Sequence, residues 1–244
     1  MEWKDEGIII GTRKHGETSL IVEVMTRRHG RHLGIVRGGR SRKKQPFLQP
    51  GNSVETSWRA RLDEHLGTWS IEATELRTAS LMETPIGIFG IQTLASHLRL
   101  LPERDAHEHL HEALEVILSH LQDASIAAIL MIKFELALLE DLGFGLDLSK
   151  CAMSGVTDGL SHVSPKSGRA VCLEQAAPWI DKLLVLPEFL SSNGSQLHPE
   201  LPEIEAGFAL SGYFLKRHVY EPRGLGSPTD RASFIKAISK QLIG

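Results

Sequence analysis

Cysteine is scarce in this sequence, which has only Cys151 and Cys172 among 244 residues. Two cysteines are too few for the disulfide framework that holds small secreted domains together. A chain of this length, with 41% hydrophobic residues, is long enough to bury a core of its own. The scarcity of cysteine therefore favours a reducing compartment, although a single bridge between the two stays possible.

Long hydrophobic runs are absent as well. No stretch approaches the roughly 18 consecutive apolar residues that a membrane span needs. The first residues, MEWKDEG, lack the charged and then apolar pattern of a signal peptide. We therefore expect a protein of the cytoplasm that makes no contact with membranes.

The motifs of several common enzyme sites are also missing. The sequence contains no G-x-x-x-x-G-K-[ST] motif, no G-x-S-x-G motif, and no G-x-G-x-x-G motif between a strand and a helix. The sequence therefore gives no indication of nucleotide hydrolysis, serine hydrolysis or dinucleotide binding. We expect no catalytic residues.

What the sequence has in excess is positive charge in one short segment. Residues 1–80 contain 14 Lys and Arg against 10 Asp and Glu, whereas residues 81–244 contain 13 against 20. Such asymmetry indicates that one end binds a polyanion, although an ordinary solvated loop is the alternative. Residues 27–44 carry eight basic side chains and no acidic one: Arg27, Arg28, Arg31, Arg37, Arg40, Arg42, Lys43 and Lys44.

The first third of the chain reads as short strands separated by glycine or charged turns. Five strands in about 70 residues suit a small closed barrel of the oligonucleotide-binding (OB) type better than a sandwich, which needs seven or more. The basic segment begins at the end of the second strand and continues into the loop after the third, near the nucleic-acid face of such a barrel. The expected strands are 7–13, 19–26, 32–37, 51–57 and 66–73.

The pattern becomes helical after Thr84, which precedes Pro85 as an N-cap precedes a first-turn proline. Helical spacing of apolar residues returns several times, around a glycine-rich insertion at 143–172 that resembles a degenerate zinc ribbon. We expect an α+β protein with an OB-type barrel at 1–80 and a helical domain at 81–244. The expected helices are 85–101, 103–121, 125–142, 173–186, 201–219 and 228–244.

One metal motif competes with this interpretation. His107, Glu108 and His111 form H-E-x-x-H, in which two imidazoles bind zinc and the glutamate acts as general base. Glu135 on the next helix is a candidate third ligand of a zinc metallohydrolase. However, both histidines flank an apolar stripe that begins at Leu110, which favours an ordinary amphipathic helix.

The two cysteines suggest a second metal site that is incomplete. Cys151 with Ser154, and Cys172 with Gln175, have the spacing of a zinc ribbon that has lost one cysteine from each pair. Structural zinc needs four ligands, and His162 supplies at most a third. We therefore expect no structural zinc and no cofactor.

The basic segment suggests a binding chemistry of its own. Lys and Arg hold phosphates and release condensed counterions, so that affinity falls as salt rises. Trp58 and Trp69, on or near the last two expected strands, are candidates for stacking on bases, with core packing as the alternative.

Several segments together resemble the RecO family of bacterial DNA repair and recombination mediators. They are GIIIGTRKHGETSLIVEVMTRRHGR, IVRGGRSRKK, FLQPGNSVE, IKFELALLEDLGFGLDLSKCAMSG and VSPKSGRAVC. The resemblance implies binding of single- and double-stranded DNA, association with the nucleoid, and strand annealing without enzymatic turnover. It also implies the partner RecR and help in loading the recombinase RecA onto strands coated by single-stranded-DNA-binding protein.

The resemblance bears on two further positions. Many family members have four cysteines where this sequence has Cys151, Ser154, Cys172 and Gln175. Lys133 stands where the family has an arginine beside a groove that takes the acidic, apolar tail of single-stranded-DNA-binding protein. An RNA-binding module on the same barrel would explain the basic segment but not the resemblance of the later segments.

Overall fold

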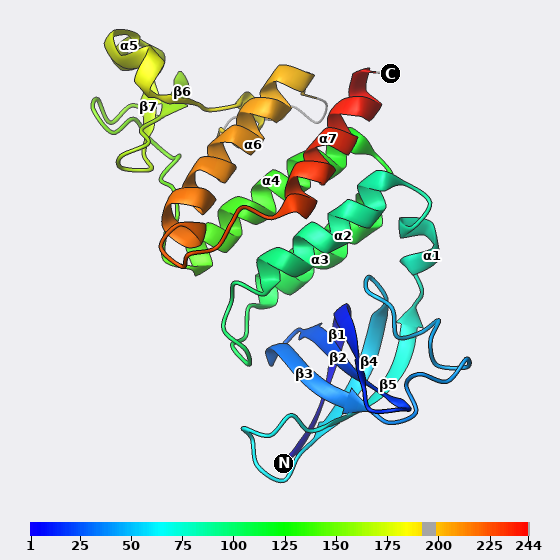
Figure 1. The fold of residues 1–244 in the computed structure, drawn as a ribbon. Coiled ribbons are helices and arrows are strands. Elements are labelled where there is room, and N and C mark those ends of the chain that lie inside the picture. The colour runs from blue at the N-terminus through cyan, green and yellow to red at the C-terminus, as the bar shows by residue number, and fades with distance from the viewer. Residues whose placement is uncertain (192–198, 244) are drawn as a thin grey trace. The chain divides into compact units, whose positions relative to one another are not determined.

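A computed structural model describes residues 1–191 and 199–243. Its first element is a closed barrel of five strands: β1 (Glu2–His15), β2 (Ser19–Thr26), β3 (Gly30–Val36), β4 (Ser53–Arg59) and β5 (Thr68–Glu75). The strands follow the order β1-β2-β3-β5-β4, and the parallel pairing of Ile35 with Thr68 joins β3 to β5 and completes the closure (Figure 1). The OB-type barrel is confirmed.

The first strand begins five residues earlier than its apolar pattern predicted. Residues 2–6, EWKDE, contain no apolar run, yet they pair with the end of β4 from Glu2↔Arg59 to Glu6↔Glu55. Pairing between backbones needs no particular side chain, which is why the sequence pattern missed this part of β1.

The barrel core accounts for both tryptophans that were candidates for base stacking. Trp58 is fully buried and Trp69 is 5% exposed, and both pack with Ile9, Val22 and other apolar side chains. Their indole N–H groups donate to the carbonyl oxygens of Leu66 and Val22, each at 3.1 Å. The base-stacking prediction for these two residues is therefore wrong, because burial in the barrel decides their role.

Three helices share a compact unit, Met1–Gln122, with the barrel: α1 (Thr78–Leu81), α2 (Pro85–Leu98) and α3 (Glu108–His120). The Thr84 hydroxyl accepts a hydrogen bond from the Gly87 N–H at 3.0 Å, as the N-cap pattern predicted. Both α2 and α3 pack against β1. The unit thus extends about 40 residues past the expected domain end at residue 80, since α1–α3 lie with the barrel.

The second unit, Asp123–Gly244, is built around α4 (Ala124–Asp141). Asp123 caps this helix by accepting the Ile126 N–H at 3.0 Å, and Gly143 just after it has a φ of +85°. The helix packs against α6 (Leu201–Leu215) and α7 (Thr229–Ile243), and a π-helical turn, Lys216–Tyr220, continues α6. The helix expected over 125–142 is thus α4, and the other long helices of this unit pack against it.

The region between α4 and α6 contains more regular structure than the sequence suggested. Three short strands, β6 (Leu160–Val163), β7 (Ala170–Cys172) and β8 (Leu184–Val185), form a sheet in the order β7-β6-β8. The helix expected over 173–186 is reduced to α5 (Leu173–Ala176), a 3-10 segment (Ala177–Lys182) and β8. Pro178 explains the break, since proline cannot donate the backbone hydrogen bond of a continuing helix. A last 3-10 turn covers Glu188–Leu190.

Candidate nucleic-acid interface

The segment between β3 and β4, residues 37–52, carries five of the eight predicted cations and is called the cationic loop. It begins with a turn at Gly38, whose φ is +64°, a conformation that glycine adopts without strain. The chain then crosses the hairpin between β1 and β2. The Arg40 N–H donates to the Thr18 carbonyl oxygen at 3.0 Å, and its guanidinium donates to the Gly16 and Glu17 carbonyl oxygens at 3.1 and 2.5 Å. Arg40 thus fastens the loop to the hairpin.

The other end of the cationic loop is fastened to the barrel. Leu48 is 3% exposed and belongs to the barrel core. Asn52, fully buried, donates to the Pro46 and Phe47 carbonyl oxygens and accepts the N–H groups of Arg77 and Thr78. Its side chain therefore connects the loop to the start of α1, and the loop has a defined shape.

Four cations of this loop face the solvent: Arg37, Arg42, Lys43 and Lys44. Lys44 Nζ donates to the Arg37 carbonyl oxygen at 3.0 Å, which keeps these two residues together. No acidic residue occurs between positions 37 and 54. Across residues 1–191 and 199–243, none of the four side chains forms a salt bridge. Their charges are thus free to meet an external anion.

The hairpin adds two cations that the sequence analysis missed. Arg13 and Lys14 are exposed at the end of β1, paired with Ile21 and Leu20 of β2, directly before the turn that Arg40 holds. Glu17 is the one acidic residue of the hairpin tip. In the sequence these two cations are part of an Arg-Lys-His run directly before the hairpin glycine Gly16. This run lies outside residues 27–44, the segment with the highest density of positive charge.

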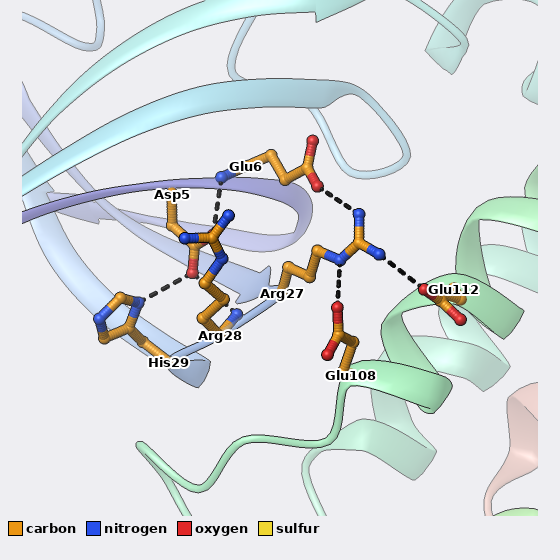
Figure 2. A network of polar contacts seen from close by, with 7 residues as sticks. All are labelled: Asp5, Glu6, Arg27, Arg28, His29, Glu108 and Glu112. Atoms are coloured by element: carbon orange, nitrogen blue, oxygen red, sulfur yellow. Dashed lines mark hydrogen bonds and ion pairs between the residues drawn. The ribbon is translucent and has the colours of Figure 1, made fainter.

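The other predicted cations lie at the opposite end of β2 and β3. The eight residues of β2 separate the two groups by roughly 25 Å along the strand. Arg27 binds three carboxylates of its own unit, Glu6 on β1 at 2.8 Å and Glu108 and Glu112 on α3 at 2.5 and 2.7 Å (Figure 2). The hydrogen bonds that the Arg27 guanidinium donates to Glu6 and Glu108 raise its pKa. Arg27 thus links helix α3 to the barrel.

The turn that follows Arg27 is organised by a buried carboxylate. Asp5, whose side chain is 2% exposed, accepts the Arg28 backbone N–H at 2.9 Å and contacts His29 Nδ1 at 2.8 Å (Figure 2). The imidazole of His29 stacks on Trp3 with 3.9 Å between ring centroids. The side chain of Arg28 is exposed.

Arg31 serves the packing of the same unit. Its guanidinium donates to Glu23 at 2.8 Å and to the Leu101 carbonyl oxygen at 3.2 Å, and its side chain is only 12% exposed. Glu23 also accepts two hydrogen bonds from Arg99 at the end of α2. The predicted basic segment is therefore divided: Arg27 and Arg31 form internal ion pairs, whereas Arg28 and four cations of the loop are exposed.

The H-E-x-x-H motif does not form a metal centre. His107 immediately precedes α3, Glu108 is bound to Arg27, and His111 is 3% exposed with both ring nitrogens lacking a hydrogen bond. Glu135 is buried in the second unit, where Arg231 and Ser211 bind its carboxylate. In the described part of the chain, no three His, Cys, Asp or Glu side chains are placed to hold a metal ion. The zinc metallohydrolase hypothesis has no support.

The two cysteines lie together, but the part of the chain that the structure describes supplies no further zinc ligands beside them. Both are buried, and the Cys172 N–H donates to Cys151 Sγ at 3.3 Å. Ser154 Oγ lies 3.6 Å from Cys172 Sγ. Burial alone would raise the pKa of the Cys151 thiol, but hydrogen bonds from Ser154 and from backbone N–H groups lower it to about 6. His162 bonds to the Ser161 hydroxyl instead. Two thiols without further ligands do not fit tetrahedral zinc.

Lys133 lies on the exposed side of α4 at the rim of a cavity of about 370 Å³ in the second unit. Six apolar residues, one cation, one carboxylate and one serine line the cavity. The lining residues are Lys133, Leu136, Ala137, Glu140, Leu146, Leu148, Phe189, Leu190 and Ser191.

None of the helices in the described residues is long and apolar enough to cross a membrane.

Comparisons with known proteins agree with this architecture. Residues 1–77 match the family described as "Recombination protein O N terminal", and residues 97–225 match "Recombination protein O C terminal". A protein of Mesorhizobium japonicum named DNA repair protein RecO is 60% identical over 240 residues, which cover 98% of this chain and 94% of the relative. Proteins of the same name from Chelativorans sp. and Brucella abortus are 56% and 55% identical, over 99% of this chain and 97% and 98% of theirs. The chain therefore belongs to the recombination protein O family.

Proposed function

We propose that this protein is a DNA-binding mediator of repair and recombination that acts without enzymatic turnover. It binds single- and double-stranded DNA and anneals complementary strands. Together with RecR, it helps to load RecA onto strands coated by single-stranded-DNA-binding protein. The observation that carries this proposal is the cationic loop, which is fastened at both ends and presents four unpaired cations in a family of DNA repair proteins.

The chemistry of the loop suits phosphate rather than a reacting group. Each cation that meets a phosphate releases condensed counterions, and no bond needs to form or break. Neutralisation of the backbone also lowers the repulsion between two complementary strands, which is what annealing requires. An RNA-binding module would use the same loop, but it would not explain the family match over residues 97–225.

Lys133 and its cavity are proposed to receive the C-terminal tail of single-stranded-DNA-binding protein. Leu136, Leu146 and Phe189 offer apolar contacts, and the Lys133 ammonium offers a partner for a carboxylate. A lysine binds such a group as a point charge, without the two parallel hydrogen bonds of an arginine. Glu140, also at the cavity, would favour a tail whose acidic groups lie toward the Lys133 end.

The proposed function is tested by strand annealing. We expect Arg42→Glu/Lys43→Glu to abolish annealing of complementary strands coated with their binding protein, because two attractive contacts become repulsive. Lys236→Glu/Lys240→Glu makes the same change of charge at exposed positions of α7 and serves as the control. Equal annealing by the two double variants would contradict the proposal.

The tail site is tested separately by titration with a peptide of the tail sequence. Lys133→Glu is expected to weaken peptide binding while leaving DNA binding unchanged, because it repels the tail carboxylates. Lys240→Glu is the matched control. Peptide affinity that is unchanged in Lys133→Glu would place the tail elsewhere.

A further inference from the structure

Phe47 lies in the cationic loop with its ring open to solvent. The residue is 39% exposed, three positions after Lys44 and four after Lys43. In the described part of the chain no aromatic or cationic side chain contacts its ring, whereas the equally exposed Phe144 stacks on His218 at 5.0 Å. An exposed aromatic ring without an aromatic or cationic partner in the described structure therefore stands among the solvent-facing cations of the loop.

The backbone of Phe47 is held firmly although its ring is exposed. Its N–H donates to the Lys44 carbonyl oxygen at 3.1 Å, and its own carbonyl oxygen accepts the Asn52 amide at 3.0 Å. The next residue, Leu48, is anchored in the barrel core. The fold thus fixes the position of a ring that does not contribute to the core, and a partner need not order this part of the chain.

The surroundings of the ring identify the chemical class of that partner. Residues 37–54 carry cations and no acid, so a ligand that reaches Phe47 passes a strongly positive surface and is a polyanion. A polyanion that also offers flat faces to an aromatic ring is a nucleic acid with unstacked bases. In a duplex the faces of the bases are covered by their neighbours, so only a single strand presents them.

We infer that Phe47 is a base-stacking site and that it gives the cationic loop a preference for single strands over duplexes. This inference rests on the proposed DNA-binding function. In this arrangement Arg42, Lys43 and Lys44 hold phosphates of either form, and the ring adds a contact that only an unpaired base can make. Phe47 thereby takes the role that the buried Trp58 and Trp69 cannot fill.

The test compares three probes of equal length: a single strand of thymidines, the same strand with abasic sites, and a duplex. Phe47→Ala is expected to weaken binding of the thymidine strand roughly tenfold, as loss of one stacked base does in other single-strand binders. Its affinity for the abasic strand and for the duplex should equal that of the unchanged protein. Phe47→Trp should restore binding of the thymidine strand. Phe144→Ala removes an equally exposed ring from the second unit and is the control.

The outcomes separate this inference from the proposed function. Equal affinity of the unchanged protein and Phe47→Ala for the thymidine strand would overturn the stacking site, and so would an equal loss of affinity for all three probes. If Arg42→Glu/Lys43→Glu nevertheless loses all three probes, the proposed function stands without the stacking site. If that double variant binds every probe normally, DNA binding by the loop fails as well.

Discussion

His32 is an unusual residue of the barrel because it is a buried histidine without hydrogen bonds. It is 2% exposed, neither ring nitrogen has a hydrogen-bond partner in the described structure, and its ring meets Trp58 and Trp69 nearly edge-on. Burial lowers its pKa to about 4, with further contributions from the positive charge of Arg104 and from His29. Asp63 opposes this effect only weakly. The neutral form of His32 is therefore the one that fits the fold.

This pKa predicts a loss of stability in mild acid. The unfolded chain takes up a proton at His32 near pH 6.5 and the folded chain only near pH 4, so stability is complete above about pH 6.5 and falls between these values. We expect the free energy of unfolding to drop by about 2 kcal/mol from pH 7 to pH 5 through His32. Urea denaturation at both pH values measures the drop.

The matched variant is His32→Phe, which keeps an aromatic ring but cannot titrate. The drop between pH 7 and pH 5 should be smaller in this variant, whatever its stability at pH 7. Some dependence on pH will persist, because burial also lowers the pKa of His111. An identical drop in both proteins would assign the effect to other groups.

A second prediction concerns the buried ion pair of the second unit. The Glu135 carboxylate, fully buried on α4, accepts hydrogen bonds from Arg231 at 2.7 and 2.9 Å and from the Ser211 hydroxyl at 2.5 Å. Arg231→Met leaves this carboxylate without its cation. We expect a loss of about 3–5 kcal/mol in the free energy of unfolding.

The double variant Glu135→Leu/Arg231→Met should lose less than the single variant, since no uncompensated charge stays buried. Chemical denaturation of the three proteins measures the difference. A single variant that is as stable as the unchanged protein would mean that water reaches the carboxylate.

At the level of elements, Arg27 determines how α3 meets the barrel. It is the one guanidinium in the described structure that binds carboxylates from both β1 and α3. Arg27→Ala is expected to speed amide hydrogen exchange in the first turns of α3, because Glu108 and Glu112 lose their common partner. Affinity for single-stranded DNA should not change, since this guanidinium is already neutralised. Arg28→Ala, at the exposed neighbouring position, is the control for the exchange measurement.

The strands of the barrel could be predicted because burial on one face leaves a pattern in the sequence. On β4, Val54, Thr56 and Trp58 alternate with exposed or half-exposed residues, and these three side chains point inward. The internal ion pairs could not be predicted. Glu108 and Glu112 lie 81 and 85 positions from Arg27 along the chain, and no local pattern in the sequence indicates a contact between residues so far apart.

At the scale of the whole molecule, fewer cations of the basic segment lack an ion pair than the sequence suggested. The first unit contains 16 Lys and Arg against 16 Asp and Glu, so it has no net charge. Carboxylates of β1, β2 and α3 neutralise the cations at positions 27 and 31, whereas the exposed cations of the loop and the hairpin tip have no such partners among the described residues. The candidate site is thus about half of the predicted basic segment, together with Arg13 and Lys14.

This distribution predicts a specific dependence on salt. If five of the loop and hairpin cations meet phosphates of a single strand, log K falls against log[salt] with a slope of about −3.5. Arg42→Gln/Lys43→Gln should make the slope shallower by about 1.4. Affinity measured at several salt concentrations gives both values, and an unchanged slope in the double variant would exclude these two residues from the contact.

Arg40, Leu48 and Asn52 hold the cationic loop in one conformation, and this should affect how fast the loop associates with a nucleic acid. Association is slower when binding requires a conformational change. Here the fold itself fixes the conformation of the loop. The association rate should therefore be set by diffusion and long-range electrostatic attraction. Variants that remove a contact of the loop should mainly shorten the lifetime of the complex.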